Sequence, residues 1–299
     1  MAANLEPLLK HQIPGRVHVV EGQGGLAKIV VTTPASQAEI YPHGAHITHF
    51  QKTGEAPLLF LSRRSGFAAG QPIRGGVPIC FPWFGGRDGE PSHGFVRLVE
   101  WQLIQTAVTP AGAVTLRFAL PPVPGREAWQ SLRTEFIVTV ADTLTMELVA
   151  ANESCGQTLE FENCLHTYFH VGDIDGVTLT GLQNTAFLDF AAGAGGARLV
   201  QAEAALLIPR ETNRVYLDTS APVEIHDAAL RRVIRVEKQH SQSTVVWNPW
   251  TTQKMPDDFD PAEHRQMVCV ESGNVKQSKI SLPPGQSAAL QVRISSRPL

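Results

Sequence analysis

The sequence predicts an all-β protein, built as a large antiparallel sandwich or barrel with very little helix. Short runs rich in Val, Ile, Thr, Phe and Trp recur along the 299-residue chain, and Gly, Pro, Asn or Asp separates most of them. Sustained helical periodicity is nearly absent. Many strands with few helices are typical of antiparallel sandwiches and barrels.

The predicted strands follow one another from residue 28 to residue 294. Within the segment TLTMELVA, Leu144, Met146 and Leu148 alternate with polar residues, the period of two that is typical of a half-buried strand. The early strands are Lys28–Thr33, Trp101–Thr106, Val114–Leu120, Glu135–Val140 and Thr143–Ala150. The later ones are Leu159–Phe169, Val177–Leu179, Val223–His226, Arg232–Glu237, Thr244–Trp247, Met267–Glu271, Lys279–Leu282 and Ala288–Ile294.

One short helix is predicted at Pro261–Gln266. Asp260 is a suitable N-cap there, and Pro261 occupies the first helical position. The Gly- and Ala-rich segment Ala191–Ala197 is expected to be a loop, because strand patterns continue on both sides of it. No internal repeat, linker or charge run marks a boundary, so we expect residues 1–299 to form a single domain.

Composition excludes several classes of function. Lys and Arg number 25 against 28 Asp and Glu, a net charge of −3 that argues against a general nucleic-acid binder. No stretch reaches the ~18 apolar residues of a membrane helix, and the N-terminus does not resemble a signal peptide, so we expect a cytoplasmic protein. The cysteines, which form no C-x-x-C pair, are expected to be free thiols and not disulfides or zinc ligands. They are Cys80, Cys155, Cys164 and Cys269.

Two glycine-containing segments carry basic residues that need an explanation. The loop Gln71–Gly86 is apolar except for Arg74, which requires either a structural carboxylate partner or a functional role. In the segment PSHGFVR, His93 precedes a glycine in a predicted turn and Arg97 follows four residues later. Taken alone, such a histidine is more often a packing residue than a catalytic one.

Three strands bear candidate functional side chains. In Leu159–Val171 a period of two places several polar residues on one face, which suits a concave site: Glu160, Glu162, Cys164, His166, Tyr168 and His170. Glu271 ends an apolar strand, where a carboxylate is either desolvated and functional or turned outward to solvent. Trp247, in VVWNPW, is either a platform for a sugar ring or core material.

The histidine clusters give little support to a metal site. His166 and His170 have a spacing that binds metal on a helix, but on a strand their rings lie two pleats apart. In the segment HGAHITH, histidines three residues apart point to opposite faces of a strand. We therefore predict no metal, and a metal-dependent sugar isomerase is the remotest of the functions considered.

With these segments identified, the chain resembles the hexose-6-phosphate mutarotase branch of the aldose 1-epimerase, or galactose mutarotase-like, family. The matching motifs run in the family's order over most of the chain: GAHITHF, IRGGVPICFPWFG, SHGFVRLVEW, LHTYFHVGDI, RVYLDT, VVWNPW and MPDD…VCVES. The resemblance implies a β-supersandwich with a site on a concave face. It also implies an isomerase that interconverts the α and β anomers of a hexose 6-phosphate, glucose 6-phosphate first among them, without a cofactor.

The resemblance also assigns roles to residues. His166 matches the general acid that protonates the ring oxygen O5, and Glu271 matches the general base that takes the proton from the O1 hydroxyl. His93 matches a sugar-contacting histidine, and Arg74 and Arg97 match basic positions that hold the 6-phosphate. Asn213 stands where the family usually has an Asp that contacts sugar hydroxyls, so the sugar preference can differ. Trp247 completes the predicted substrate-binding set.

A second function remains open from the sequence: a non-catalytic module on the same scaffold that binds a phosphorylated sugar or a protein. The presence of both His166 and Glu271 favours the enzyme, since a binding module needs neither. We expect a small-molecule hexose phosphate as partner, no nucleic acid or membrane, and a monomer or weak dimer. If Glu271 and His166 are close and charged, their attraction should lower the pKa of the first and raise that of the second.

Overall fold

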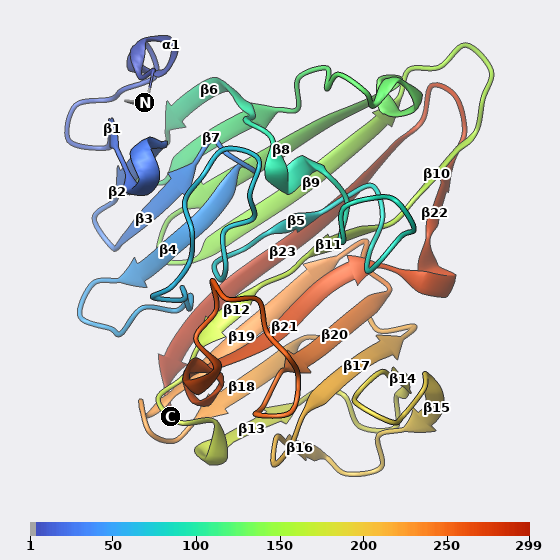
Figure 1. The fold of residues 1–299 in the computed structure, drawn as a ribbon. Helices are drawn as coiled ribbons and strands as arrows, with labels where there is room; N and C mark the ends of the chain where they lie inside the picture. Colours follow the sequence, from blue (N-terminus) through green and yellow to red (C-terminus); the bar gives the residue numbers. More distant parts are fainter. Residues whose placement is uncertain (1–3) are drawn as a thin grey trace.

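Two large antiparallel sheets, stacked face to face, make up most of the computed structural model, which describes residues 4–299 (Figure 1). One sheet has nine strands in the order β16-β13-β18-β19-β23-β9-β8-β7-β6. Their bounds are β6 Gln102–Val108, β7 Val114–Ala119, β8 Leu132–Val140, β9 Leu144–Asn152, β13 Val177–Thr180, β16 Ala205–Leu207, β18 Val223–Asp227, β19 Arg232–Gln239 and β23 Ser287–Pro298.

The second sheet has eight strands and carries the functional site. Its order is β15-β14-β17-β20-β21-β11-β5, with β12 pairing with β21 beside β11. The bounds are β5 Ile79–Cys80, β11 Asn163–Leu165, β12 Tyr168–His170, β14 Ala186–Asp189, β15 Ala197–Val200, β17 Thr212–Leu217, β20 Ser243–Asn248 and β21 Met267–Asn274.

Smaller elements complete the fold. A four-stranded sheet near the N-terminus contains β1 Val17–Glu21, β2 Ala27–Thr32, β3 Ser36–Tyr41 and β4 His46–Lys52, and β10 Leu159–Phe161 pairs with β22 Ile280–Leu282. In the described part of the chain, helical residues are confined to α1 Glu6–Leu9 and to the 3₁₀ turns Gln23–Gly25, Val96–Leu98, Glu127–Trp129, Ile174–Gly176, Pro261–Gln266 and Lys276–Ser278. No helix within residues 4–299 combines the length and hydropathy needed to cross a membrane.

The main hydrophobic core is formed by buried residues of both large sheets and of the four-stranded N-terminal sheet. Along β9 burial alternates strictly, and Leu144, Met146 and Leu148 point into the core, which confirms the predicted half-buried strand. Strands β20 and β21 are buried at every position. Their second face therefore does not meet solvent directly, because loops cover it and enclose the functional site described below.

The all-β prediction is confirmed, but several strand boundaries differ. The segment predicted as one strand at Leu159–Phe169 is three short strands: β10 pairs with β22, whereas β11 and β12 both pair with β21. The structure adds strands that were not predicted: β1, β3, β4, β5, β14, β15, β16 and β17. Pro261–Gln266 forms a 3₁₀ helix, and the Asp260 carboxylate accepts a hydrogen bond from the Ala262 N–H, as expected of an N-cap.

The contrast between core and surface positions gives a stability prediction. Leu116 on β7 is fully buried, whereas Leu207 on β16 is 56% exposed. Leu116→Ala should lower the free energy of unfolding by about 2–5 kcal/mol, because it leaves a cavity in the core. The same truncation at Leu207 should change it by less than about 0.5 kcal/mol. Urea unfolding of both variants measures the difference, and equal losses would contradict the assignment of the core.

Candidate active site

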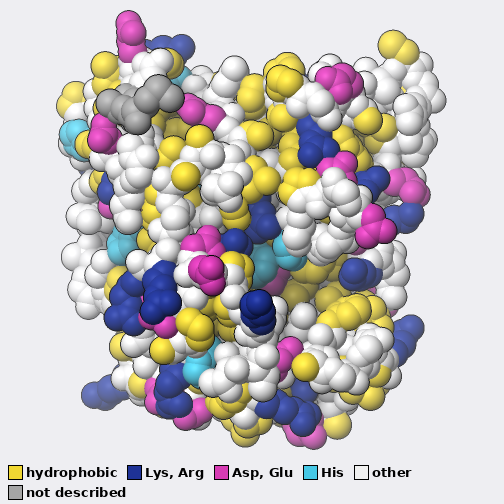
Figure 2. All heavy atoms as spheres, viewed as in Figure 1, with side chains coloured by type: hydrophobic (Ala, Val, Ile, Leu, Met, Phe, Trp, Pro, Cys, Tyr) yellow, Lys and Arg dark blue, Asp and Glu magenta, His cyan; other side chains and the backbone are white. Residues whose placement is uncertain are grey.

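A cavity of about 720 Å³ opens on the face of the eight-stranded sheet that is turned away from the core. Its floor comes from β17, β20 and β21, and its walls come from loops near residues 70–74, 84–98 and 253–256 together with Lys276. Basic and histidine side chains gather around a hollow near the middle of the face seen in Figure 2. All the residues predicted from the sequence as site residues line this one cavity: Arg74, His93, Arg97, His166, Asn213, Trp247 and Glu271.

Strand register brings these distant residues together. Asn213 on β17 is paired with Trp247 on β20, Trp247 with Cys269 on β21, and Cys269 with Tyr168 on β12. These side chains form a row across one face of the sheet, since directly paired residues point the same way. Glu271 lies two residues beyond Cys269 and therefore on the same face.

The same register sets His166 opposite Glu271. Leu165 is paired with Ser272 and Tyr168 with Cys269, so the antiparallel register with β21 is continuous across the break between β11 and β12. His166 Nε2 lies 3.3 Å from Glu271 Oε1, and both side chains are buried. The imidazole also stacks on the Tyr168 ring, with centroids 4.7 Å apart and the planes 11° from parallel. Two groups able to exchange protons thus face one another at the base of the cavity.

A thiol holds the other oxygen of the Glu271 carboxylate. Cys164 Sγ lies 3.5 Å from Glu271 Oε2 and donates its hydrogen bond there. Cys164 is paired with Gly273, and a Cβ added to that glycine would lie 2.8 Å from the Cys164 Cβ and 2.4 Å from the Asn163 carbonyl oxygen. Glycine at 273 therefore permits the close approach of β11 to β21 that places the thiol on the carboxylate.

Burial reverses the pKa shifts that were expected for the pair. Loss of water raises the pKa of the Glu271 carboxyl well above its ordinary value, although the Cys164 hydrogen bond and the positive charge of Arg97 oppose this. Burial likewise lowers the pKa of His166 well below its ordinary value, and the nearby His93 and Arg97 add to the effect. The expectation of a lowered Glu271 pKa and a raised His166 pKa is therefore wrong, because desolvation of both groups outweighs their mutual attraction.

His93 enters the cavity from a strained turn. It has a φ of +63°, and the following Gly94 has a φ of +76°, where an added Cβ would lie 1.9 Å from the Phe81 carbonyl oxygen. Burial and the charges of three cations lower the pKa of His93 to about 3, so the ring is neutral. Its Nδ1 accepts a hydrogen bond from the Gly85 N–H at 3.3 Å, which leaves the proton on Nε2. His93 is therefore a hydrogen-bond donor.

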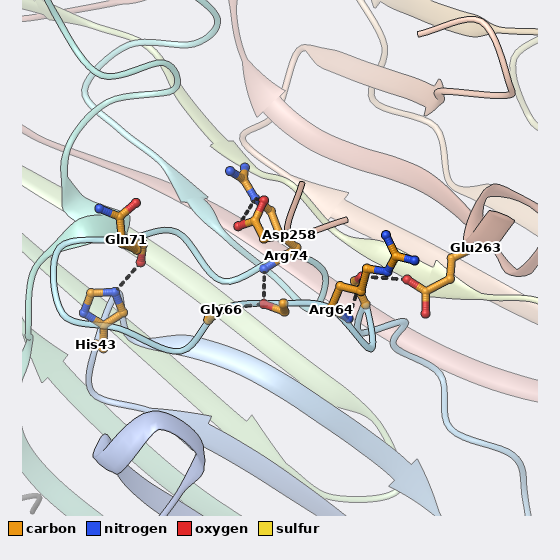
Figure 3. A network of polar contacts seen from close by, with 9 residues as sticks. His43, Arg64, Gly66, Gln71, Arg74, Asp258 and Glu263 are labelled. Atoms are coloured by element: carbon orange, nitrogen blue, oxygen red, sulfur yellow. Dashed lines mark hydrogen bonds and ion pairs between the residues drawn. The ribbon is translucent and has the colours of Figure 1, made fainter. Parts of the chain in front are cut away.

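Three cations surround His93: Arg97, Lys276 and Arg74 each lower its pKa. Arg74 is not free, since its Nε donates to both carboxylate oxygens of Asp258, at 2.9 and 3.0 Å (Figure 3). The structural carboxylate partner considered for Arg74 is thus present, and the arginine lines the cavity as well. Arg74 therefore brings less uncompensated charge to the cavity than the other two cations.

The Arg97 guanidinium and the Lys276 ammonium form no ion pair with a carboxylate among the residues that the structure describes. Arg97 Nη2 donates to the Ser92 carbonyl oxygen at 2.7 Å, and its buried Nε has no hydrogen-bond partner. The Lys276 ammonium lies 5.5 Å from the centroid of the Phe190 ring, which also lines the cavity. The cavity therefore holds uncompensated positive charge in a protein whose net charge is negative.

Sequence reasoning missed Lys276 and its support. The Glu162 carboxylate accepts hydrogen bonds from two backbone N–H groups, that of Lys276 at 2.5 Å and that of Phe84 at 2.9 Å. It thereby connects two walls of the cavity. Lys276 follows the Glu271 strand by a few residues, but a single lysine in a turn carries no motif. The only sequence signal for this wall of the cavity was that Glu162 belongs to the predicted polar face of Leu159–Val171.

The remaining histidines of the sequence motifs lie elsewhere. His43 Nε2 donates to the Gln71 carbonyl oxygen, as Figure 3 shows, and His46 Nε2 donates to the Gly75 carbonyl oxygen. His49 and His170 line a second cavity, of about 400 Å³. His166 and His170 therefore do not share a site, although Tyr168, on β12, still lines the same cavity as His166.

Comparisons with known proteins identify the family. A model of the family described as "Aldose 1-epimerase" matches residues 27–295. The chain is 34% identical over 281 residues to an Escherichia coli (strain K12) protein named "Putative glucose-6-phosphate 1-epimerase", with 90% of each chain covered. It is 30% identical over 291 residues to a Cenchrus ciliaris protein of the same name, covering 94% of this chain and 88% of that one.

A solved structure shows the same architecture. The crystal structure of a "putative mutarotase (YeaD)" from Salmonella typhimurium superposes with a TM-score of 0.88 at 30% sequence identity, covering 97% of this chain and 96% of the other. The fold is thus the galactose mutarotase-like β-sandwich that the motifs implied. The extent of the family match, together with these relatives, establishes that the chain belongs to the aldose 1-epimerase family.

Proposed function

We propose that this protein is a hexose-6-phosphate mutarotase that interconverts the α and β anomers of glucose 6-phosphate. The observation that carries the proposal is the contact of 3.3 Å between His166 Nε2 and Glu271 Oε1 at the base of a cavity whose walls hold Arg97 and Lys276. An acid–base pair suits the chemistry at C1, and free cations suit a phosphate. The names of the relatives from Escherichia coli and Cenchrus ciliaris support the same reaction.

In the proposed reaction, Glu271 takes the proton from the O1 hydroxyl while His166 delivers a proton to the ring oxygen O5. The C1–O5 bond breaks, O1 becomes the carbonyl oxygen of the open aldehyde, and rotation about C1–C2 exposes its other face. Closure reverses the two proton transfers. No electron leaves or enters the substrate, so two positioned proton-transfer groups are sufficient, each contributing typically ~10²–10⁴-fold.

The buried His166–Glu271 pair suits this cycle because the reaction requires the two groups to hold only one titratable proton between them. With the pKa of Glu271 raised and that of His166 lowered, the pair holds one proton between those two values. In the free site that proton favours Glu271. A hydroxyl donating to the carboxylate and a ring oxygen accepting from Nε2 favour the ionised pair instead, because hydrogen bonds to a charged form stabilise it. Substrate binding thus prepares the base and the acid together.

The remaining lining residues suit a hexose. Neutral His93 offers an Nε2–H donor, and the Asn213 amide both donates and accepts hydrogen bonds. The Trp247 indole is held by a hydrogen bond from Nε1 to Gln253 Oε1 at 2.9 Å and provides an apolar surface for a sugar ring. At the other end of the sugar, Arg97 and Lys276 would receive the 6-phosphate, assisted by Arg74.

The proposal is tested by the anomerisation rate of freshly dissolved α-glucose 6-phosphate, followed by NMR exchange with and without protein. The wild type should accelerate exchange, and Glu271→Gln should reduce kcat by about 10²–10⁴-fold because the amide is no base. A module that only binds sugar phosphates would bind without any acceleration. Wild-type protein that binds glucose 6-phosphate but leaves its exchange unchanged would therefore overturn the proposal in favour of that module.

Arg74 forms an ion pair with a carboxylate, whereas Arg97 and Lys276 do not, so removing each cation should affect phosphate binding to a different extent. Arg97→Ala and Lys276→Ala should each lower kcat/KM for glucose 6-phosphate about 10–100-fold, since each loses a charge-assisted hydrogen bond. Arg74→Ala should cost less, because Asp258 already neutralises that guanidinium. Exposed Arg198, on β15, serves as the matched control, and its replacement by Ala should have no effect.

The same variants should leave the turnover of free glucose almost unchanged, because that substrate has no phosphate to hold. Steady-state kinetics on both sugars makes the comparison. Equal turnover of glucose and glucose 6-phosphate by the wild type would remove the phosphate role and place the protein among the free-aldose mutarotases.

The pKa shifts predict a broad pH profile. An exposed histidine acting as the acid would lose its proton, and the activity with it, above about pH 6.5. Here the single proton of the pair is lost only above the raised pKa of Glu271, and a second proton enters only below the lowered pKa of His166. The value of kcat should therefore show no limb near pH ~6.5, the ordinary histidine value.

This profile is measured as kcat at saturating glucose 6-phosphate, with the uncatalysed rate subtracted. Saturation matters because the phosphate itself ionises near pH ~6 and alters binding. An alkaline limb close to pH 6.5 would show that His166 titrates as an ordinary imidazole and that the shifts play no part.

A further inference from the structure

We propose that His166, Glu271 and Cys269 form a binding site for Zn²⁺ or a similar thiophilic divalent cation, and that the cation inhibits the enzyme. One potential ligand atom from each residue lies within 4.8 Å of the other two, and all three side chains are buried. Zinc binds histidine nitrogen, carboxylate oxygen and cysteine sulfur at about 2.0–2.3 Å. Tetrahedral coordination at these bond lengths places ligand atoms about 3.5 Å apart, so side-chain shifts of up to about 1 Å would bring these atoms around one ion.

The Cys269 thiol has no other role in the site. It makes no hydrogen bond within residues 4–299 and belongs to a small apolar cluster with Trp247, Phe60, Phe259 and Met267. Cys164 already holds Oε2 of the Glu271 carboxylate, which leaves Oε1 turned toward His166 and available to an ion. Cys269 and Glu271 lie on β21, and His166 lies between β11 and β12, both of which pair with β21, so little has to be ordered when an ion binds.

Charge and ligand type favour zinc over harder cations. A dication bound by one thiolate and one carboxylate makes a neutral complex, which a buried position tolerates better than an isolated charge. Sulfur and imidazole ligands select zinc and related ions, whereas Mg²⁺ and Ca²⁺ require oxygen ligands. Three protein ligands leave a fourth position that faces the cavity, where water or a sugar oxygen could bind.

Inhibition follows from which atoms the ion would occupy. A cation on His166 and Glu271 takes the lone pairs that proton transfer needs, so it should compete with glucose 6-phosphate. This part of the inference rests on the proposed function. The binding itself does not, and it can be measured on protein that shows no activity.

The test is titration of the purified full-length chain with Co²⁺, which reports a thiolate ligand as a charge-transfer band in the near ultraviolet. The wild type and Cys155→Ala should both show the band with one ion bound per chain, since Cys155 is the exposed cysteine. Cys269→Ala should lose the band and bind Zn²⁺ at least 10–100-fold more weakly, the loss seen when only an outer-shell partner is removed. Glu271→Gln, which preserves side-chain shape, provides a second ligand deletion if Cys269→Ala does not fold.

In activity assays Zn²⁺ should inhibit the wild type and Cys155→Ala, competitively with glucose 6-phosphate and reversibly with a chelator. For Cys269→Ala, inhibition measured relative to its own uninhibited rate should require at least 10–100-fold more Zn²⁺. A wild type without the cobalt band, or a band that survives in Cys269→Ala and vanishes in Cys155→Ala, would overturn the site. A cobalt band in a protein with no mutarotase activity would sustain the site and refute the proposed function instead.

Discussion

The structure depends on the burial of one carboxylate. Glu271 is 1% exposed and lies within a strand that is buried at every position. An isolated charge there would cost several kcal/mol, so its surroundings must either neutralise it or provide hydrogen bonds. They do both: Cys164 holds one oxygen and His166 faces the other. The cavity, the stacked Tyr168 and the close strand approach at Gly273 all serve to keep these groups in place.

The cavity combines an acid–base pair with cations that form no ion pair with a carboxylate. At its base, desolvation favours a pair that shares one proton and can exchange it with a sugar at little cost. Toward Arg97 and Lys276, cations without carboxylate partners are suited to a dianionic group. A substrate with a phosphate at one end and an anomeric centre at the other matches this division.

Many strands could be predicted because the residue composition and the alternation of apolar residues indicate a strand from its own short stretch of sequence. The alternation of Leu144, Met146 and Leu148 identifies a half-buried strand without any knowledge of its neighbours. The segment Leu159–Phe169 shows the limit of such reasoning. Its period of two is continuous, but its first piece pairs with β22 and its other two pieces pair with β21, all about 100 residues or more away in sequence. No local pattern records where a strand changes partner.

In the candidate site, too, local sequence identifies individual residues, whereas long-range strand pairing decides how they are arranged. His166 and Glu271 could be named from the residues and the family motifs, but their opposition depends on a register set by long-range pairing. Arg74 could be identified as needing a partner, whereas Asp258, 184 residues away, could not be identified as that partner. The pKa directions were predicted wrongly because attraction between charges can be inferred from sequence, while the depth of burial cannot.

The central claim is that Glu271 and His166 act on O1 and O5 while Arg97 and Lys276 hold the phosphate. A crystal structure of Glu271→Gln with glucose 6-phosphate tests it most directly, since a slow variant retains its ligand. We expect O1 to lie within hydrogen-bond distance of the side chain at position 271 and O5 to lie beside His166 Nε2. The phosphate should contact Arg97 and Lys276. A sugar bound in the opposite direction, or a phosphate bound outside this cavity, would contradict it.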